Sequence, residues 1–177
     1  MNIGLNKVLD PACGVLDMCC GCRYMHFDKE DPRVLFCDIR DGEFPMVDKG
    51  KERLARVHPD VQIDFRNLPA WWTESFSLVI FDPPHLLHAG KKSFMRAKYG
   101  VLDREQWRSD LHLGFLEGFR VLKPGGTLIF KWSEVQIKIS EVIPLAHPHK
   151  PIFRSSRGGT HFIVFHKTPT QQTQLTQ

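Results

Sequence analysis

The chain has 177 residues, of which 42% are hydrophobic, which is enough for the core of one ordinary domain. No apolar run approaches the roughly 18 residues that a membrane helix needs, and the N-terminus lacks the features of a signal peptide, so a cytoplasmic protein without membrane contact is expected. The net charge is only +4, and five cysteines, three of them within four positions, argue against a secreted disulfide framework.

Short apolar runs separated by turn residues predict the strands of the fold. Several of them are continuous runs of Val, Ile, Leu and Phe rather than alternating ones, which is typical of a parallel sheet that is covered by helices. The six predicted strands are Val15–Met18, Val34–Phe36, Val61–Ile63, Leu78–Phe81, Thr127–Trp132 and Phe162–Phe165.

Helices are expected between these strands, which indicates an α/β domain. The clearest covers Arg104–Leu122, where large apolar residues recur every three or four positions, and Pro124-Gly125-Gly126 ends it. A weaker helix is predicted over Lys49–Val57, and only a short one fits after Gly21 because Pro32 follows soon. The tail 168–177 is mostly Thr and Gln and is expected to be disordered, which leaves 1–167 as a single domain.

The spacing of two acids points to a ligand-binding turn. Asp17 ends the first strand, Gly21 follows it, and Asp38 ends the second strand 21 positions after Asp17. This fits a βαβ unit whose second acid holds ribose hydroxyls, whereas the similar turn at Asp10 lies too far from Asp38. Because Cys22 and Arg23 stand where further glycines are needed, a dinucleotide site is disfavoured.

A second site motif is Asp82-Pro83-Pro84-His85, which follows the strand Leu78–Phe81. Ligands of open α/β sheets bind at the carboxyl ends of the strands. The two prolines remove two amide donors, so the Asp82 carboxylate and nearby carbonyls make an acceptor-rich pocket. Such a pocket suits an amino group on a planar ring.

In this order, Leu16-Asp17-Met18-Cys19-Cys20-Gly21, Asp82-Pro83-Pro84-His85 and Val121-Leu122-Lys123-Pro124-Gly125-Gly126 resemble a class I S-adenosylmethionine-dependent methyltransferase. The resemblance covers roughly residues 15–167. More narrowly, the chain is similar to the Asp-Pro-Pro-Tyr enzymes that methylate exocyclic amines of adenine or cytosine, and to small methyltransferases of phages and prophages. The resemblance implies a Rossmann-like fold with a mostly parallel seven-stranded sheet that is flanked by helices and has an antiparallel last strand.

The resemblance also implies how a cofactor, S-adenosylmethionine, is held. Asp17 and Gly21 are expected against its methionine part, Asp38 at its ribose and Asp64 at its adenine amine. Arg23 is expected to cap its carboxylate. Further expected cofactor contacts are Cys20, Ile39, Phe65 and Asp82.

The expected reaction is an in-line displacement in which a substrate nitrogen attacks the sulfonium methyl, so the protein mainly supplies geometry and electrostatics. Asp82 and the carbonyl of Pro83 accept the two amine protons, and Pro84 and His85 complete the catalytic motif. His85 replaces the usual Tyr or Phe that stacks on an extruded base. Histidine can stack as well, while the alternative is a histidine that only packs the loop, and the change leaves the identity of the substrate open.

The segment between Ala89 and Arg108 has six basic residues and two acids, a net charge of +4. Basic residues for phosphates and rings for bases predict a nucleic-acid surface, although a solvated loop is the alternative. The expected substrate-binding residues are His85, Lys91, Lys92, Phe94, Arg96, Lys98 and Tyr99. The expected partner is DNA or RNA, bound by a monomer or a homodimer.

A metal site is not expected, because Cys19, Cys20 and Cys22 lie too close together to chelate one zinc ion without strain. Three functions stay open at this point. The first is methylation of a nucleobase amine, with adenine N6 preferred. The second is methylation of a protein glutamine or asparagine amide or of a small molecule, and the third is a catalytically silent module that binds the cofactor.

Overall fold

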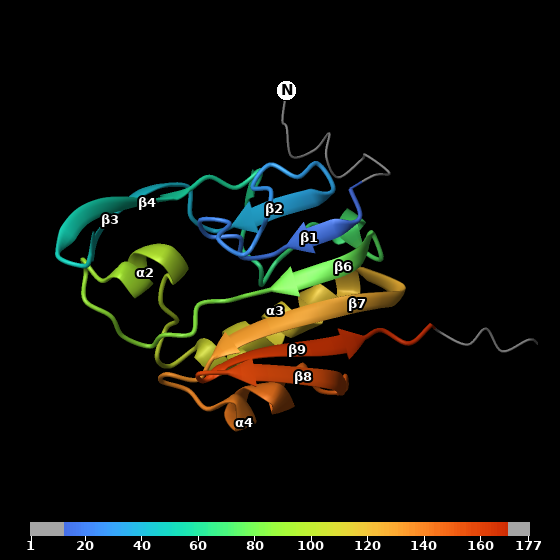
Figure 1. The fold of residues 1–177 in the computed structure, drawn as a ribbon. Coiled ribbons are helices and arrows are strands. Elements are labelled where there is room, and N and C mark those ends of the chain that lie inside the picture. Colours follow the sequence, from blue (N-terminus) through green and yellow to red (C-terminus); the bar gives the residue numbers. More distant parts are fainter. Residues whose placement is uncertain (1–12, 170–177) are drawn as a thin grey trace, which may run out of the picture.

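A computed structural model describes residues 13–169, and the fold is built on one mixed seven-stranded sheet with strand order β5-β2-β1-β6-β7-β9-β8 (Figure 1). Strands β5, β2, β1, β6 and β7 are parallel, and β9 runs antiparallel to both β7 and β8. The strands of the sheet are β1 (Val15–Asp17), β2 (Val34–Asp38), β5 (Val61–Gln62), β6 (Phe76–Phe81), β7 (Leu122–Ser133), β8 (Pro151–Arg157) and β9 (Thr160–His166). The predicted fold class and the six predicted strands are confirmed.

The helices of the described residues are α2 (Phe94–Tyr99), α3 (Trp107–Val121) and α4 (Ile139–Val142), with the short 3-10 helices η1 (Ala70–Trp72) and η2 (Ile143–Ala146). Helix α3 confirms the clearest helix prediction. It ends at Val121 because Leu122 is already extended and Pro124 follows. Its buried stripe consists of Trp107, Leu111, Phe115 and Phe119, which repeat every four residues and pack into the main core.

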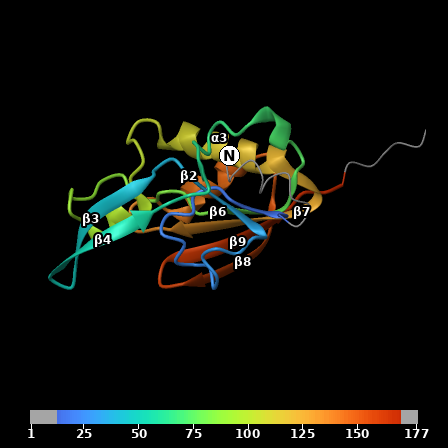
Figure 2. The same ribbon diagram turned by 90° about the horizontal axis from the view of Figure 1, so that it is seen from above.

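The long helix α3 lies on one face of the sheet, behind the strands in Figure 1 and to one side of them in Figure 2. No helix covers the opposite face within residues 13–169. Over β1 and β2 that face is covered by the turns of residues 18–33, where Arg23 lies 4.0 Å from the centre of the Phe36 ring. His26 contacts the edge of the same ring at 4.7 Å. The predicted short helix after Gly21 is therefore wrong, because this segment forms turns that pack on β2.

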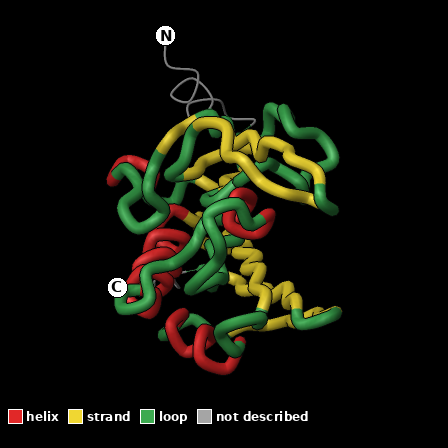
Figure 3. The backbone as a smooth tube through the Cα atoms, turned by 90° about the vertical axis from the view of Figure 1, so that its left-hand side faces the viewer, coloured by secondary structure: helices red, strands yellow, loops and turns green. Residues whose placement is uncertain are grey.

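The predicted helix over Lys49–Val57 is also wrong. The segment pairs with the preceding residues as an antiparallel hairpin of β3 (Gly42–Asp48) and β4 (Lys51–Val57). Lys49 and Gly50 form its two-residue turn with φ values of 51° and 75°, the conformation that a hairpin turn of this length favours. Pairing of β3 with β4 at seven positions stabilises the hairpin more than the weak helical pattern would stabilise a helix. Figure 3 looks at this end of the molecule, where α2 lies beside the hairpin.

Helix α2 falls within the segment that the sequence predicted as a basic loop. Ala97 of α2 packs against Met46 and Ala55 of the hairpin in a small apolar cluster. The cluster stands apart from the main core, so α2 and the hairpin form a separate ledge at the carboxyl edge of the sheet. Apart from Thr168 and Pro169, the tail that was expected to be disordered lies outside the described residues. Asp10 also lies outside them.

Candidate functional site

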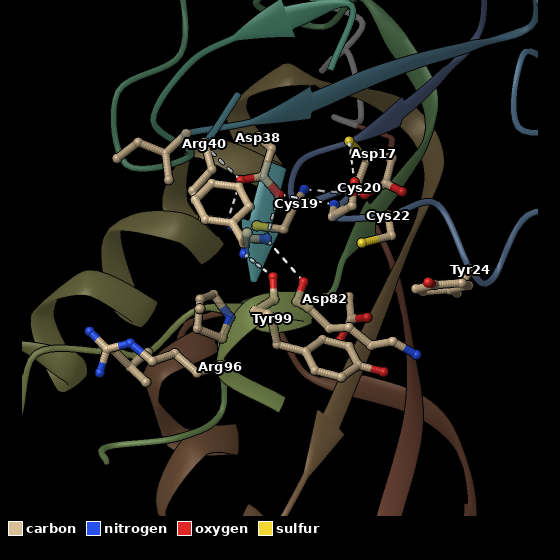
Figure 4. Close-up of a pocket in the computed structure, with 18 of the residues that line it drawn as sticks. Asp17, Cys19, Cys20, Cys22, Tyr24, Asp38, Arg40, Asp82, Arg96 and Tyr99 are labelled. Atoms are coloured by element: carbon tan, nitrogen blue, oxygen red, sulfur yellow. Dashed lines mark hydrogen bonds and ion pairs between the residues drawn. The ribbon is translucent and has the colours of Figure 1, made fainter. Parts of the chain in front are cut away.

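A cavity of about 470 Å³ lies at the carboxyl ends of β1, β2 and β6, under the ledge formed by α2 and the hairpin (Figure 4). Strand β1 pairs with β2 on one side and β6 on the other, so the chain reverses its direction across the sheet at this point. Ligands of open α/β sheets bind at such a reversal. The lining includes Asp17, Asp38 and Asp82, one from each of the three strand ends.

Asp17 forms the floor of the cavity beside β1. Its Oδ1 accepts a hydrogen bond from the amide of Cys19 at 3.1 Å, and its Oδ2 lies 2.8 Å from Nε2 of His26. Burial raises the pKa of the Asp17 carboxyl, and the contact with His26 opposes this rise. The pair fixes the turn that follows β1.

Asp38 joins three parts of the site. Its Oδ2 accepts a hydrogen bond from the amide of Gly21 at 2.9 Å, and its Oδ1 accepts from Nε of Arg40 at 3.1 Å. Arg40 in turn donates to the carbonyls of Ala97 at 3.0 Å and Lys98 at 3.1 Å, at the end of α2. The end of β2 therefore holds both the turn after β1 and the helix above the cavity.

Gly21 is required at this turn for two reasons. Its φ is +49°, which side-chain-bearing residues rarely adopt, and an added Cβ would lie 3.1 Å from the carbonyl oxygen of Lys98. The absence of a side chain leaves space between the turn and α2. The turn around Gly21 thus leaves an open space next to Asp38, which is called the Gly21 cradle below.

Asp82 lies across the cavity from this cradle and is only 8% exposed. Its Oδ2 accepts a hydrogen bond from Nζ of Lys131 at 2.7 Å, whereas its buried Oδ1 has no partner among the described residues. Burial raises the pKa of Asp82 to about 6, even though the Lys131 charge acts in the opposite direction. A buried acceptor without a donor is costly, so Oδ1 is prepared for a ligand that brings one.

His85, like Pro83 of the same motif, is buried and does not line the cavity. It is 2% exposed, and neither ring nitrogen has a hydrogen-bond partner in residues 13–169. Its ring packs 5.0 Å from that of Tyr99 and 6.2 Å from that of Trp132. Burial, with the nearby Lys131 charge, lowers the pKa of His85 to about 4, so the imidazole is neutral at pH 7.

Tyr99, whose ring packs against that of His85, lines the cavity instead (Figure 4). The Lys131 ammonium lies 5.1 Å from the centre of the Tyr99 ring. At the cavity mouth, the Lys98 ammonium lies 3.9 Å from the ring centre of Tyr24 and 3.8 Å from that of Phe94. Around Tyr99 and at the mouth, the cavity thus combines aromatic rings with lysine ammonium groups.

The structure separates the predicted site residues into two groups. Those that line the cavity are Asp17, Cys20, Gly21, Asp38, Ile39, Phe65, Asp82, Pro84, Lys91, Arg96, Lys98 and Tyr99. Those that do not are Arg23, Asp64, Pro83, His85, Lys92 and Phe94. The first group includes members of both the predicted cofactor set and the predicted substrate set, which lie at one cavity.

Arg23 is not placed to cap a ligand in the cavity, which corrects its predicted role. Its guanidinium donates to the carbonyl of His58 at 2.6 Å and pairs with Asp60 at 3.2 Å. These contacts hold residues 18–33 against β2 and the segment before β5. Its φ of 55° is unusual for a residue with a side chain, and the same contacts stabilise that conformation.

Asp64 is held in an ion-pair network outside the cavity. Its carboxylate accepts from Nε of Arg66 at 2.9 Å, and Arg66 also reaches Asp110 of α3 at 2.8 Å. The neighbouring Phe65 lines the cavity and packs against Phe81 at 5.3 Å. The network therefore fixes the backbone that presents Phe65.

Sequence reasoning missed Lys131, Arg40, His26 and Tyr24. Lys131 could have been noticed in the sequence, because it is a charged residue within the apolar run Leu128-Ile129-Phe130-Lys131-Trp132.

The three clustered thiols line the cavity, and burial raises the pKa of both Cys19 and Cys20, which keeps them protonated. Within residues 13–169, no three His, Cys, Asp or Glu side chains come together in a way that could hold a metal ion. No helix in the same residues is long and apolar enough to cross a membrane.

Solved structures share this fold. One is the PH0226 protein from Pyrococcus horikoshii OT3, with a TM-score of 0.56, 16% identity and coverage of 87% of this chain and 82% of that one. A second is a SAM-dependent methyltransferase from Methanosarcina mazei, with a TM-score of 0.55, 12% identity and coverage of 94% and 97%. A third is a variant of the 16S rRNA (adenine(1408)-N(1))-methyltransferase from Catenulisporales acidiphilia, with a TM-score of 0.53, 11% identity and coverage of 93% and 89%.

The chain matches no protein-family model and no curated protein. At identities of 10–16%, the structural likenesses show the fold, which is the Rossmann-like fold of class I methyltransferases.

Proposed function

We propose that this protein is an S-adenosylmethionine-dependent methyltransferase that methylates an exocyclic amine of a nucleobase in DNA or RNA, with adenine N6 as the preferred target. The observation that carries the proposal is the buried Oδ1 of Asp82, which has no hydrogen-bond partner in residues 13–169. It lies in the same cavity as Asp17, Gly21 and Asp38. The cavity thus combines an acceptor for N–H groups with the acids and the glycine turn expected for the cofactor.

The cavity fits that cofactor in two respects. The Gly21 cradle provides space beside Asp38 that a Cβ would reduce. The second is the Asp38 carboxylate at the cavity, which already accepts four hydrogen bonds, one from the Gly21 amide and three from Arg40, so ribose hydroxyls would share its oxygens with these donors. Asp17, Gly21 and Cys20 would hold the methionine part, Asp38 and Ile39 the ribose, and Phe65 the adenine ring. When bound, the cofactor supplies an activated methyl group on a sulfonium.

The residues of this chain would then position the acceptor amine. Asp82 accepts one N–H through Oδ1 and thereby directs the nitrogen lone pair toward the methyl group. The sequence predicts that the Pro83 carbonyl accepts the other N–H, but Pro83 does not line the cavity. An aromatic amine is a poor nucleophile because its lone pair is delocalised, and this orientation counteracts that. Tyr99 offers a ring on which a base can stack, and Lys91, Arg96 and Lys98 offer charge for phosphates.

The charges of the site favour an uncharged amine over an alkylammonium group. Asp82 is already paired with Lys131, and Asp38 is paired with Arg40. A charged substrate ammonium that approaches Asp82 would be repelled by the ammonium of Lys131. A nucleobase amine is uncharged at neutral pH and avoids this repulsion.

The deciding experiment transfers a tritiated methyl group from S-adenosylmethionine to separate pools of DNA, RNA and protein. We expect label in a nucleic-acid pool. Label that appears only in protein would contradict the nucleobase assignment. No label in any pool, together with cofactor binding in isothermal titration calorimetry, would indicate a silent binding module.

The Asp82→Ala variant tests the role of the unpartnered oxygen. We expect methyl transfer to be abolished because the amine loses its acceptor, while calorimetry still detects cofactor binding. Asp28→Ala, which changes an exposed carboxylate outside the cavity, is the matched control and should transfer methyl groups normally. Loss of cofactor binding in Asp82→Ala would assign Asp82 to the cofactor instead.

A further inference from the structure

Lys131 is a buried cation in the middle of an apolar strand. It is 9% exposed and lies in β7 between Phe130 and Trp132, both fully buried. A buried lysine is costly unless its charge is paired. Its one ion pair in the described structure is the 2.7 Å contact with Asp82 from the neighbouring strand β6. Its position is therefore explained by Asp82 rather than by the packing of the core.

The contact divides the Asp82 carboxylate into two unequal halves. Oδ2 accepts a hydrogen bond from Nζ of Lys131, whereas Oδ1 is buried at the cavity and has no partner in the part of the chain that the structure describes. The hydrogen bond to Oδ2 restricts rotation of the carboxylate, so Oδ1 stays directed toward the cavity. The same contact supplies the positive charge that favours the ionised form, and only that form is an acceptor at both oxygens.

Other groups around Asp82 act against its ionisation. Asp17 from β1 places a second negative charge near it, and burial disfavours the charged form most strongly. Cys19, on the turn after β1, is protonated, and His85, three residues after Asp82, is neutral at pH 7. Lys131 is the charged group that favours ionised Asp82 in the described structure.

We propose that Lys131 is a positioning residue that keeps Asp82 ionised and directs Oδ1 toward the substrate amine. This inference rests on the proposed function, because the amine is the acceptor proposed above. Without Lys131, a buried Asp82 takes up a proton near neutral pH and its hydroxyl becomes a donor. The oxygen that carries the proton no longer accepts, and the other is a weaker, uncharged acceptor, so the amine would be oriented less firmly at pH 7.

The first experiment measures the charge of Asp82 without any turnover. The ¹³C resonance of the Asp82 carboxyl, assigned by comparison with Asp82→Asn, is titrated in the wild type and in Lys131→Gln, which keeps an N–H donor but removes the charge. We expect the pKa of Asp82 to be about 6 in the wild type and roughly 1–3 units higher in the variant. Lys123→Gln changes an exposed lysine of the same strand and should leave the titration unchanged.

The second experiment measures methyl transfer as a function of pH. Because ionised Asp82 is the stronger acceptor and accepts at both oxygens, the wild-type rate should fall as pH decreases through about 6. In Lys131→Gln this acid limb should move upward, so that a shift of about two units lowers the rate at pH 7 about tenfold and activity returns near pH 9. Lys131→Arg, which keeps the charge, should restore the wild-type limb, whereas a merely structural role predicts lower rates with an unmoved limb.

Three results would overturn the inference. One is a folded Lys131→Gln variant whose Asp82 titrates as in the wild type. Another is a Lys131→Gln variant in which the pKa of Asp82 rises but the pH–rate profile stays that of the wild type, which would show that Lys131 does not influence methyl transfer. If Lys131→Gln fails to fold, the ¹⁵Nζ resonance of wild-type Lys131 decides, because a neutral Lys131 at pH 7 contradicts the proposal and a charged one supports it. Absence of methyl transfer by the wild type would instead reject the proposed function, and the carboxyl titration distinguishes the two failures.

Discussion

At the scale of single residues, Tyr99 presents an aromatic ring to the cavity, although the motif predicted such a ring at His85. Both rings lie next to each other at 5.0 Å, but only Tyr99 lines the cavity. His85 is neutral and buried behind it, in contact with Trp132. His85 therefore packs against the Tyr99 ring, which α2 supplies from 14 positions further along the chain.

The Tyr99→Ala and Tyr99→Phe pair tests this assignment. Stacking of a base on an aromatic side chain contributes about 1–3 kcal/mol, so Tyr99→Ala should raise the KM for an oligonucleotide substrate roughly 5- to 150-fold. Tyr99→Phe keeps the ring and should remain close to the wild type. Steady-state kinetics with a single-stranded oligonucleotide measures both. Equal KM values for Tyr99→Ala and the wild type would remove Tyr99 from the acceptor site.

At the scale of elements, Arg40 connects the sheet to the ledge above the cavity. It bonds Asp38 of β2 on one side and the last carbonyls of α2 on the other. Cations near a helix C-terminus stabilise its free carbonyls. Helix α2 has only six residues and little core of its own, so this connection determines how firmly it is held.

Arg40→Ala should therefore loosen α2 without unfolding the sheet. We expect faster amide hydrogen exchange over residues 94–100 and unchanged exchange in β6 and β7, measured by mass spectrometry. Arg53→Ala removes an exposed ion pair with Asp48 in the hairpin and serves as the control. Unchanged exchange in α2 after Arg40→Ala would show that the apolar cluster at Ala97 holds the helix alone.

At the scale of the whole molecule, stability depends on one helix-covered face of the sheet. Helix α3 packs its buried stripe on β6 and β7, and Gly114 lets it approach closely. A Cβ at Gly114 would lie 2.4 Å from the ring of Phe81 and 2.8 Å from that of Phe65. Because Phe65 also lines the cavity, this contact links the core to the site.

Gly114→Ala should destabilise the protein although alanine favours helices. The clash requires shifts of two packed rings, and overpacking of this kind costs about 1–3 kcal/mol. For a chain of this size the melting temperature should fall by roughly 2–12 °C in a thermal denaturation experiment. Gly90→Ala, where an added Cβ meets nothing within 4 Å, is the control. A melting temperature of Gly114→Ala at or above the control would contradict the packing argument.

The sequence determined the order of the strands along the chain, the long helix and the acids at the strand ends. Continuous apolar runs and a four-residue stripe are local patterns, so they predicted β1, β2, β6, β7 and α3 without knowledge of the fold. The spacing of Asp17, Gly21 and Asp38 and the prolines after Asp82 likewise predicted which strand edge holds the site. The roles of these residues in binding cofactor and substrate stay predictions.

Only the tertiary structure decided which side chains meet. The hairpin formed because β3 and β4 pair over seven positions, a gain that the helical pattern of either segment cannot reveal. Lys131 and Asp82 are 49 residues apart, and the contact depends on the register of β6 and β7. Arg23 bonds the segment before β5 instead of the cavity, and His85 lies behind Tyr99, because long-range packing sets the direction of each side chain after the local pattern has set its strand or turn.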